Sequence, residues 1–224
     1  PELKNNFHKV CLPPKMVFVS TNDQLKAVME SGFEYICINP FKQIKINNLN
    51  HLESKKIYIK VPNIVKNEFN YIEKFIDKNL DKIEGIVTAN LGIISKFRNK
   101  LNILGDYKLN ITNSCTLDFY SKITNGSCLS VELSKPEINE LIKNSSFKAQ
   151  MFVYGKVELM VSGYCALGST FGGKTTSKNC KGTCKEGEFF LIDRKKKQFP
   201  LNTGNIASLG AATKRDVRQI LAGL

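Results

Sequence analysis

The feature that most constrains this fold is a regular alternation of short apolar runs with longer amphipathic stretches. The apolar runs are rich in Val, Ile, Phe and Tyr, and they fall at residues 16–20, 35–39, 57–61, 83–89, 101–106, 128–133 and 149–155. Helical patterns separate most of these runs, at residues 21–32, 66–80, 90–100, 115–123 and 135–144. Strands and helices that alternate at intervals of roughly 20–25 residues predict parallel strands joined by helical crossovers.

This alternation predicts an α/β fold, a (β/α) TIM-barrel-like domain that is partial or near-complete. An open doubly wound sheet is the alternative. The glycine-rich GxGxxG turn of a dinucleotide-binding sheet does not follow the first strand, which favours the barrel. The length of 224 residues suits one barrel of about 200–250 residues.

The C-terminal ends of the strands are where such folds bind their ligands. We expect that edge to carry Cys37 and its neighbours up to residue 39, with Asn90, Asp106 and Glu132. Cys128 lies near the start of the predicted strand 128–133, which places it at the opposite end.

The pattern of apolar and polar residues changes after the predicted barrel segment. Residues 1–161 form the predicted barrel, and residues 162–201 combine a cysteine-rich loop with a β-hairpin over 187–201. Residues 202–224 form a divergent tail with a short amphipathic helix around Arg215–Leu221. The first residues include neither an initiating Met nor an apolar secretory segment, so we expect a piece of a longer chain.

The charge of the chain is strongly basic. Lys and Arg number 33 against 20 Asp and Glu, which gives a net charge of +13 and a pI near 9.4. This charge suits a polyanion such as RNA, although an AT-rich genome would also enrich Lys, Asn and Ile. Lys195, Lys196 and Lys197 fit either a solvated hairpin turn or a phosphate contact. A run of 18 or more apolar residues is missing, so a membrane span is not expected.

Seven cysteines are present, and three of them, Cys165, Cys180 and Cys184, share the glycine-rich stretch Tyr164–Gly187. The odd count and the missing secretory segment argue against a disulfide framework and favour a reducing cytoplasm. The spacing matches neither a ferredoxin nor a zinc ribbon. From spacing alone the three thiols are either metal ligands or unpaired thiols. We expect a bound metal to order this stretch and to bring the three sulfurs together.

A family resemblance rests on several motifs that occur in order. They are "TNDQLKAVMESGFEYICIN" (21–39), "GDYKLNITNS" (105–114), "LSVELS" (129–134), "VYGKVELMVSGYCALGS" (153–169), "C…GTC" (180–184) and "FLIDRKKKQFPL" (190–201). This set resembles the collagenase-like peptidase family (peptidase family U thirty-two) over residues from about 16 to 201. The resemblance implies a (β/α) barrel-like catalytic domain. It also implies that some members hydroxylate tRNA or rRNA pyrimidines, that others hydroxylate quinone precursors without oxygen, and that these members bind a [4Fe–4S] cluster through four cysteines.

Cys165, Cys180 and Cys184 match three of those four cluster positions. The resemblance therefore favours a [4Fe–4S] cluster over Zn as the cofactor. Many relatives carry a further cysteine after the segment that matches "FPL", and this chain has none there. Cys37, near the end of a predicted barrel strand, is the candidate for the fourth ligand. Three-cysteine ligation with an open iron is the alternative.

The residues give less support to proteolysis. Only His8 and His51 are present, and the sequence contains neither HExxH nor a recognisable Cys–His pairing. Candidate catalytic carboxylates are Glu158, inside an apolar strand, and Asp106 and Glu132, at predicted strand ends.

The preferred prediction is an iron–sulfur protein involved in hydroxylation of a pyrimidine in tRNA or rRNA. A peptidase is the first alternative, and a non-catalytic RNA-binding fragment of a longer enzyme is the second. We also expect tRNA or rRNA as a partner, and allow for a homologous partner subunit.

Overall fold

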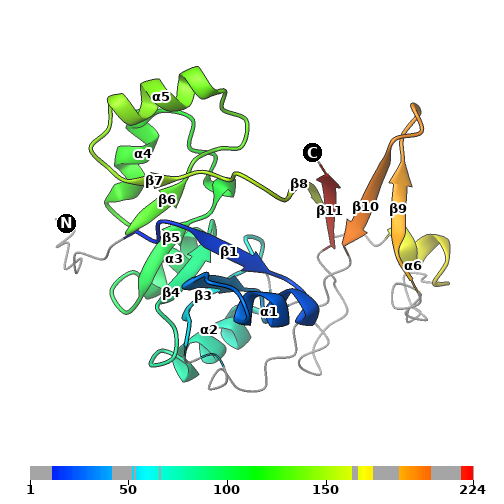
Figure 1. The fold of residues 1–224 in the computed structure, drawn as a ribbon. Coiled ribbons are helices and arrows are strands. Elements are labelled where there is room, and N and C mark those ends of the chain that lie inside the picture. The colour runs from blue at the N-terminus through cyan, green and yellow to red at the C-terminus, as the bar shows by residue number, and fades with distance from the viewer. Residues whose placement is uncertain are drawn as a thin grey trace. The chain divides into compact units, whose positions relative to one another are not determined.

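The computed structural model describes residues 12–41, 52, 54–65, 67–162, 166–173, 187–202 and 218–223. The chain divides into two compact units, Pro1–Val153 and Tyr154–Leu224. Each unit has its own sheet (Figure 1).

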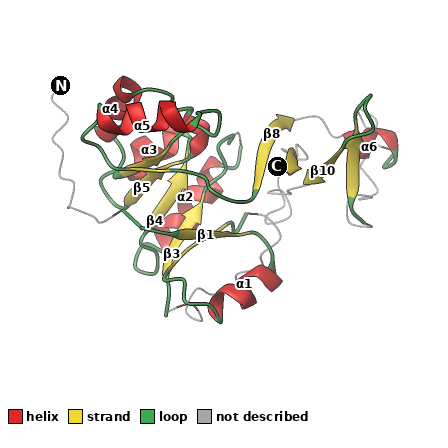
Figure 2. Ribbon diagram, turned by 45° about the horizontal axis from the view of Figure 1, so that its top comes forward, coloured by secondary structure: helices red, strands yellow, loops and turns green. Residues whose placement is uncertain are grey.

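The first unit is built on a seven-stranded parallel sheet whose strand order follows the chain. Its strands are β1 (Met16–Val19), β2 (Tyr35–Ile38), β3 (Lys56–Lys60), β4 (Gly85–Thr88), β5 (Asn102–Gly105), β6 (Gly126–Cys128) and β7 (Ala149–Gln150). The helices between them are α1 (Asn22–Met29), α2 (Phe69–Lys78), α3 (Leu91–Phe97), α4 (Ser114–Ser121) and α5 (Lys135–Lys143), with a short 3₁₀ turn η2 (Tyr107–Leu109) after β5 (Figure 2). Every neighbouring pair is parallel, which confirms the predicted α/β class with helical crossovers.

Side-chain caps fix where several of these helices begin. Thr21 and Gln24 form a capping box at the start of α1. The Asn90 side chain accepts a hydrogen bond from the Ile93 backbone N–H at α3, and Asn113 does the same for Thr116 at α4. Each cap satisfies a backbone donor that the first turn of a helix leaves unpaired, so local sequence sets these boundaries.

Alternate residues of the strands form two different faces. The inner face carries Cys37, Tyr58, Val87 and Leu104, which pack as one buried apolar cluster. The other face consists mainly of isoleucines, each at most 3% exposed: Ile36, Ile38, Ile57, Ile59, Ile86 and Ile103. Burial on both faces explains why the strands are nearly continuous apolar runs in the sequence.

The sheet curls so far that the segment before β1 reaches strands near its other edge. Leu12 packs on the inner-face cluster and occupies the place where a Cβ on Gly126 of β6 would lie. The Gln150 side chain of β7 donates a hydrogen bond of 2.7 Å to the Pro13 carbonyl. The first unit is therefore an incomplete barrel, as the sequence predicts, and Gly126 makes room for the residue that bridges its edges.

The sixth strand corrects the prediction for residues 128–133. β6 covers Gly126–Cys128, so Cys128 ends its strand and lies at the C-terminal edge, not at the opposite end. The apolar residue that follows, Leu129, is 2% exposed and packs with Ile111, Leu117 and Leu141 of the α4–α5 region. The alternating pattern after Cys128 thus reflects packing against helices. The last predicted run, 149–155, is a strand only over its first two residues, β7.

The second unit is an antiparallel sheet in the order β8-β11-β10-β9. Its elements are β8 (Lys156–Ser162), α6 (Ala166–Thr170), β9 (Phe189–Ile192), β10 (Gln198–Asn202) and β11 (Arg218–Gly223). β9 and β10 form the predicted hairpin. In its turn Asp193 Oδ1 accepts hydrogen bonds of 2.8 Å from the N–H groups of both Lys195 and Lys197.

The tail corrects a second prediction. Residues 218–221 belong to the strand β11, whereas the sequence pattern predicts a helix around Arg215–Leu221. β11 pairs with β8 on one side and β10 on the other, and these partners override a weak local helical pattern. Among the helices of the described ranges, none combines the length and apolar character needed to cross a bilayer.

Candidate site at the carboxyl edge of the parallel strands

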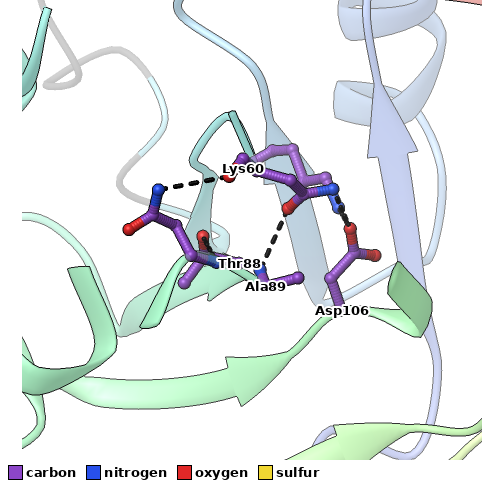
Figure 3. Close-up of polar contacts among 6 residues, drawn as sticks. Lys60, Thr88, Ala89 and Asp106 are labelled. Atoms are coloured by element: carbon purple, nitrogen blue, oxygen red, sulfur yellow. Dashed lines mark hydrogen bonds and ion pairs between the residues drawn. The ribbon is translucent and has the colours of Figure 1, made fainter. Parts of the chain in front are cut away.

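The candidate site lies where β3, β4 and β5 end. Lys60 is the last residue of β3, Thr88 is the last of β4, and Asp106 directly follows β5. The parallel register sets Lys60 beside Val87 and Thr88 beside Gly105. Three strand ends therefore deliver polar groups to one place, which Figure 3 shows.

Asp106 is the centre of this site. Its Oδ2 lies 2.5 Å from Lys60 Nζ and accepts a hydrogen bond of 2.9 Å from Asn63 Nδ2. The Asp106 side chain is 3% exposed and that of Lys60 is 19% exposed. Two ionised groups are seldom buried unless they pair, and the C-terminal strand ends are where barrels of this kind bind their ligands.

Asn63 and Asn90 hold the polar cluster in a fixed geometry. Asn63 Oδ1 accepts a hydrogen bond of 2.9 Å from the Ala89 N–H, and this fixes which way its amide faces Asp106. The Asn90 amide donates to the Asn63 carbonyl, while its oxygen caps α3. The Thr88 carbonyl accepts the Asp106 N–H at 3.0 Å. Backbone and side chains thus prevent Asp106 from turning away.

Aromatic rings stand beside the ion pair. The Lys60 ammonium lies 5.6 Å from the centre of the Phe18 ring and 5.9 Å from that of Tyr107. Tyr107 in turn packs against Phe152 with ring centres 5.9 Å apart. Phe18 is 44% exposed, so a large apolar ring at this edge remains accessible. These distances suit cation–π attraction and leave ring surface for a planar ligand.

The charges of Lys60 and Asp106 also affect the pKa values of two inner-face cysteines, Cys37 and Cys128. Burial raises the pKa of the Cys37 thiol far above its ordinary value, while nearby Lys60 lowers it and Asp106 raises it. The pKa of the Cys128 thiol is raised to about 12, chiefly by burial and also by Asp106, with Lys60 acting in the opposite direction. Both thiols are therefore protonated at neutral pH, which disfavours them as nucleophiles in this packing.

Some predicted site residues belong to this polar network, and others lie on other elements. Asp106 and Asn90 belong to the network, and Asn39 lies at the end of β2, where its side chain accepts the Phe41 N–H. Glu132 is exposed in the loop after β6. Glu158 is 9% exposed on β8 of the second unit. Lys195, Lys196 and Lys197 occupy the exposed turn between β9 and β10.

The predicted cluster ligands are a separate case. Cys165, Cys180 and Cys184 lie outside the described residues, so their convergence stays a prediction. Cys37 is fully buried among Tyr58, Val87 and Leu104, and its ligand role likewise stays a prediction. Within the ranges that the structure describes, no group of three or more His, Cys, Asp or Glu side chains is arranged to hold a metal ion.

Sequence reasoning missed Lys60 and Asn63. The signal for Lys60 was present, because this lysine directly follows three buried apolar residues at the end of a predicted strand. Asn63 carries no comparable signal, since an Asn after a strand is common in turns.

An incomplete parallel barrel with a buried ion pair at its carboxyl edge belongs to the α/β class of proteins, in which ligands generally bind at that edge. The model of Peptidase family U32 matches residues 41–212, which is more than half of the chain. The chain belongs to this family.

Two relatives illustrate the match. The chain is 28% identical over 145 residues to an uncharacterized protease, MJ0090, of Methanocaldococcus jannaschii, across 60% of this chain and 35% of that protein. The chain therefore spans about a third of the length of this curated relative. The structure of the U32 peptidase Mk0906 matches with a TM-score of 0.51 and 8% identity, over 65% of this chain and 70% of that one. A likeness at this identity concerns the fold.

Proposed function

We propose that this chain is part of an iron–sulfur protein that takes part in hydroxylating a pyrimidine of tRNA or rRNA. The observation that carries the proposal is the character of the strand edge. A buried carboxylate, an ammonium group and an amide meet there beside accessible aromatic rings. Such an edge suits a flat polar ring better than an extended peptide, because it combines hydrogen-bonding groups with stacking surface.

The thiols support this choice over a cysteine peptidase. Burial raises the pKa of both Cys37 and Cys128, so neither supplies a thiolate at neutral pH in this packing. A peptidase nucleophile needs the opposite shift or an adjacent base. The two inner-face thiols are therefore poor nucleophiles for peptide cleavage.

The cluster is the part of the proposal that rests on the sequence resemblance. Cys165, Cys180 and Cys184 would hold it, and when bound it supplies one-electron redox chemistry. A cluster ligand must be a thiolate, so ligation by Cys37 would release the proton that its burial retains. Cys37 is the candidate for the fourth ligand, and three-cysteine ligation with an open iron is the alternative.

The charge of the chain supports an RNA partner. The net charge of +13 favours association with a phosphate backbone. Lys195, Lys196 and Lys197 add three adjacent cations on an exposed turn that Asp193 keeps tight through the Lys195 and Lys197 N–H groups. We assign these lysines to phosphate contacts that position the RNA without reading its sequence.

A peptidase is the second candidate, and the names of the family and of both relatives favour it. Proteolysis would have to use groups other than the protonated Cys37 and Cys128 thiols. Cleavage of casein or gelatin by highly purified protein would support this candidate.

Anaerobic purification of the full chain, with iron and sulfide assays and a visible spectrum, tests the proposal. We expect bound iron and sulfide with brown absorbance, and we expect Cys180→Ser to remove both. Cys115→Ser is the matched control, because Cys115 is an exposed residue of α4 and its loss should leave the absorbance intact. Deletion of the gene should abolish a hydroxylated pyrimidine detected by mass spectrometry of total RNA. Metal-free protein with protease activity, and unchanged RNA in the deletion strain, would overturn the proposal.

A further inference from the structure

The carboxylate of Asp106 uses only one of its oxygens. Oδ2 receives both the Lys60 ammonium and the Asn63 amide. Oδ1 has no hydrogen-bond partner among the residues that the structure describes, although the side chain is only 3% exposed. Buried polar atoms are nearly always paired, so this acceptor calls for a donor beyond the described residues, and a bound ligand can supply it.

Lys60 offers the complementary group. A lysine ammonium carries three N–H donors, and in the described ranges its ion-pair partner is Asp106 alone. Asp106 Oδ2 can take one of these donors, and 19% of the Lys60 side chain is exposed, so further donors are available beside the same carboxylate. An acceptor and a donor therefore lie side by side, and Asn63 and Asn90 hold the acceptor in place.

Ring surfaces complete the arrangement. Phe18 and Tyr107 both lie within 6 Å of the Lys60 ammonium, and Phe18 is 44% exposed. A planar ligand that bonds to Lys60 and Asp106 would place its face against one of these rings. Stacking of a base on an aromatic ring is worth about 1–3 kcal/mol in single-strand binding proteins.

We infer that this edge binds the Watson–Crick edge of an unpaired pyrimidine. The ring donates N3–H of uracil, or N4–H of cytosine, to Asp106 Oδ1. The neighbouring acceptor, a carbonyl oxygen of uracil or N3 of cytosine, accepts from Lys60. The inference rests on the proposed function and narrows it, because a base read through this edge cannot be paired in a duplex.

This orientation has a chemical consequence. The Watson–Crick edge of a pyrimidine lies across the ring from the C5–C6 bond. Contacts to Asp106 and Lys60 therefore leave that bond free of the polar network. The network positions the base, and Asp106 and Lys60 are specificity-determining residues of the site.

Methylated nucleotides test the inference on the full chain. Uridine and cytidine 5′-monophosphates would be titrated by calorimetry or NMR against N3-methyluridine and N4,N4-dimethylcytidine 5′-monophosphates. At least one natural nucleotide should bind, and its methylated form should bind at least about tenfold more weakly, since a hydrogen bond to a charged group is lost. Equal affinities for a natural nucleotide and its methylated form, or binding of neither natural nucleotide, would overturn the inference.

A variant separates recognition from folding. Asp106→Asn should reduce the preference for the unmethylated nucleotide to within about twofold, because the amide no longer accepts as a carboxylate does. A general loss of structure would instead weaken both ligands equally. Asp77→Asn is the matched control, since Asp77 also pairs with a lysine, Lys100, but on the surface. Should Asp106→Asn fail to fold, the methylation effect on the unmodified chain decides alone.

The two proposals can fail separately. Iron content and RNA hydroxylation report the proposed function, whereas the methylation effect reports the base-binding edge. A chain that discriminates methylated nucleotides but binds no iron would retain this inference and lose the redox role.

Discussion

Two lysines of β3 show how the two ends of one strand differ. Lys56 and Lys60 are four residues apart and lie on the same face of the sheet, and each pairs with a carboxylate. Lys56 meets Glu34 at the N-terminal end, where the two side chains are 44% and 57% exposed. Lys60 meets Asp106 at the C-terminal end, where they are 19% and 3% exposed.

The surroundings of the two ion pairs also differ in their exposure to solvent. Lys56 also contacts the Tyr35 hydroxyl, and solvent reaches the whole group. Asp106 lies beneath the loop that carries Asn63 and beside η2, so its charge is removed from water. An exposed pair contributes little to stability, whereas a buried pair is costly to break. The comparison teaches that β3 carries charge at both ends but holds it buried at the C-terminal end.

Removal of Lys60 is expected to have the largest effect. Lys60→Met keeps most of the aliphatic stem, but it leaves the Asp106 carboxylate buried with Asn63 as its one side-chain partner among the residues that the structure describes. We expect the free energy of unfolding to fall by about 3 kcal/mol, measured by urea denaturation at pH 7.

The double variant Lys60→Met with Asp106→Leu sharpens this result. It removes both charges at once, so much of the loss should be recovered. If Lys60→Met alone were as stable as the unmodified chain, the Lys60–Asp106 pair would have to be solvated. The contrast between the two ends of β3 would then disappear.

Packing at the N-terminal end is tested by Gly126. A Cβ there would meet Leu12, and Leu104 lies 3.3 Å away. Gly126→Ala should therefore displace Leu12 from between the sheet edges and cost about 1–3 kcal/mol in urea denaturation. Gly32→Ala is the matched control, because nothing lies within 4 Å of its added Cβ. A small stabilisation is expected there, since alanine restricts the unfolded chain. Equal responses of the two variants would mean that Leu12 does not bridge the edges.

Much of this fold could be predicted because parallel strands buried on both faces produce unmistakable apolar runs. β2, β3 and β4 agree with their predicted ranges to within about two residues. β6 could not be located in this way, because its residues are Gly126, Ser127 and Cys128, and the stronger apolar pattern follows them. Likewise β11 depends on its partners β8 and β10, which the local pattern around Arg218 does not reveal.

The candidate site was predictable only in part. Asp106 could be placed because a carboxylate after an apolar run lies at the ligand-binding edge. The side chains that contact Asp106 could not be predicted, since they depend on which strand ends the sheet brings together. Lys60 and Asn63 come from β3 and its loop, while Asp106 follows β5, and only the strand order makes them neighbours.

The pKa of the Cys128 thiol reports the burial and the charges at the C-terminal end of the strands. Burial raises its pKa to about 12, above the ordinary value near 8.5. Its protonated form therefore stabilises the fold below the ordinary pKa, and that contribution is lost as the pH rises toward 12.

We expect iodoacetamide, followed by mass spectrometry, to label exposed Cys115 readily at pH 8 and Cys128 only at higher pH. In Lys60→Met the pKa of Cys128 should rise further, because a nearby cation that favours the thiolate is gone. Labelling of Cys128 as fast as Cys115 at pH 8 would contradict its burial.

The smallest effect is expected at the exposed end of β3. Hydrogen bonds to Glu34 and Tyr35 raise the pKa of Lys56, so its charged form is present at neutral pH and its contribution is lost only as the pH rises through the alkaline range. Lys56→Gln should shift the urea midpoint slightly at low ionic strength. About 1 M NaCl should erase that shift, because a Debye length of about 3 Å screens an exposed pair. The effect of Lys60→Met should persist in the same salt, since the buried Asp106 charge is largely shielded from the ions. A Lys56 effect that equals the Lys60 effect, or that resists salt, would show that the two ends of the strand are energetically alike.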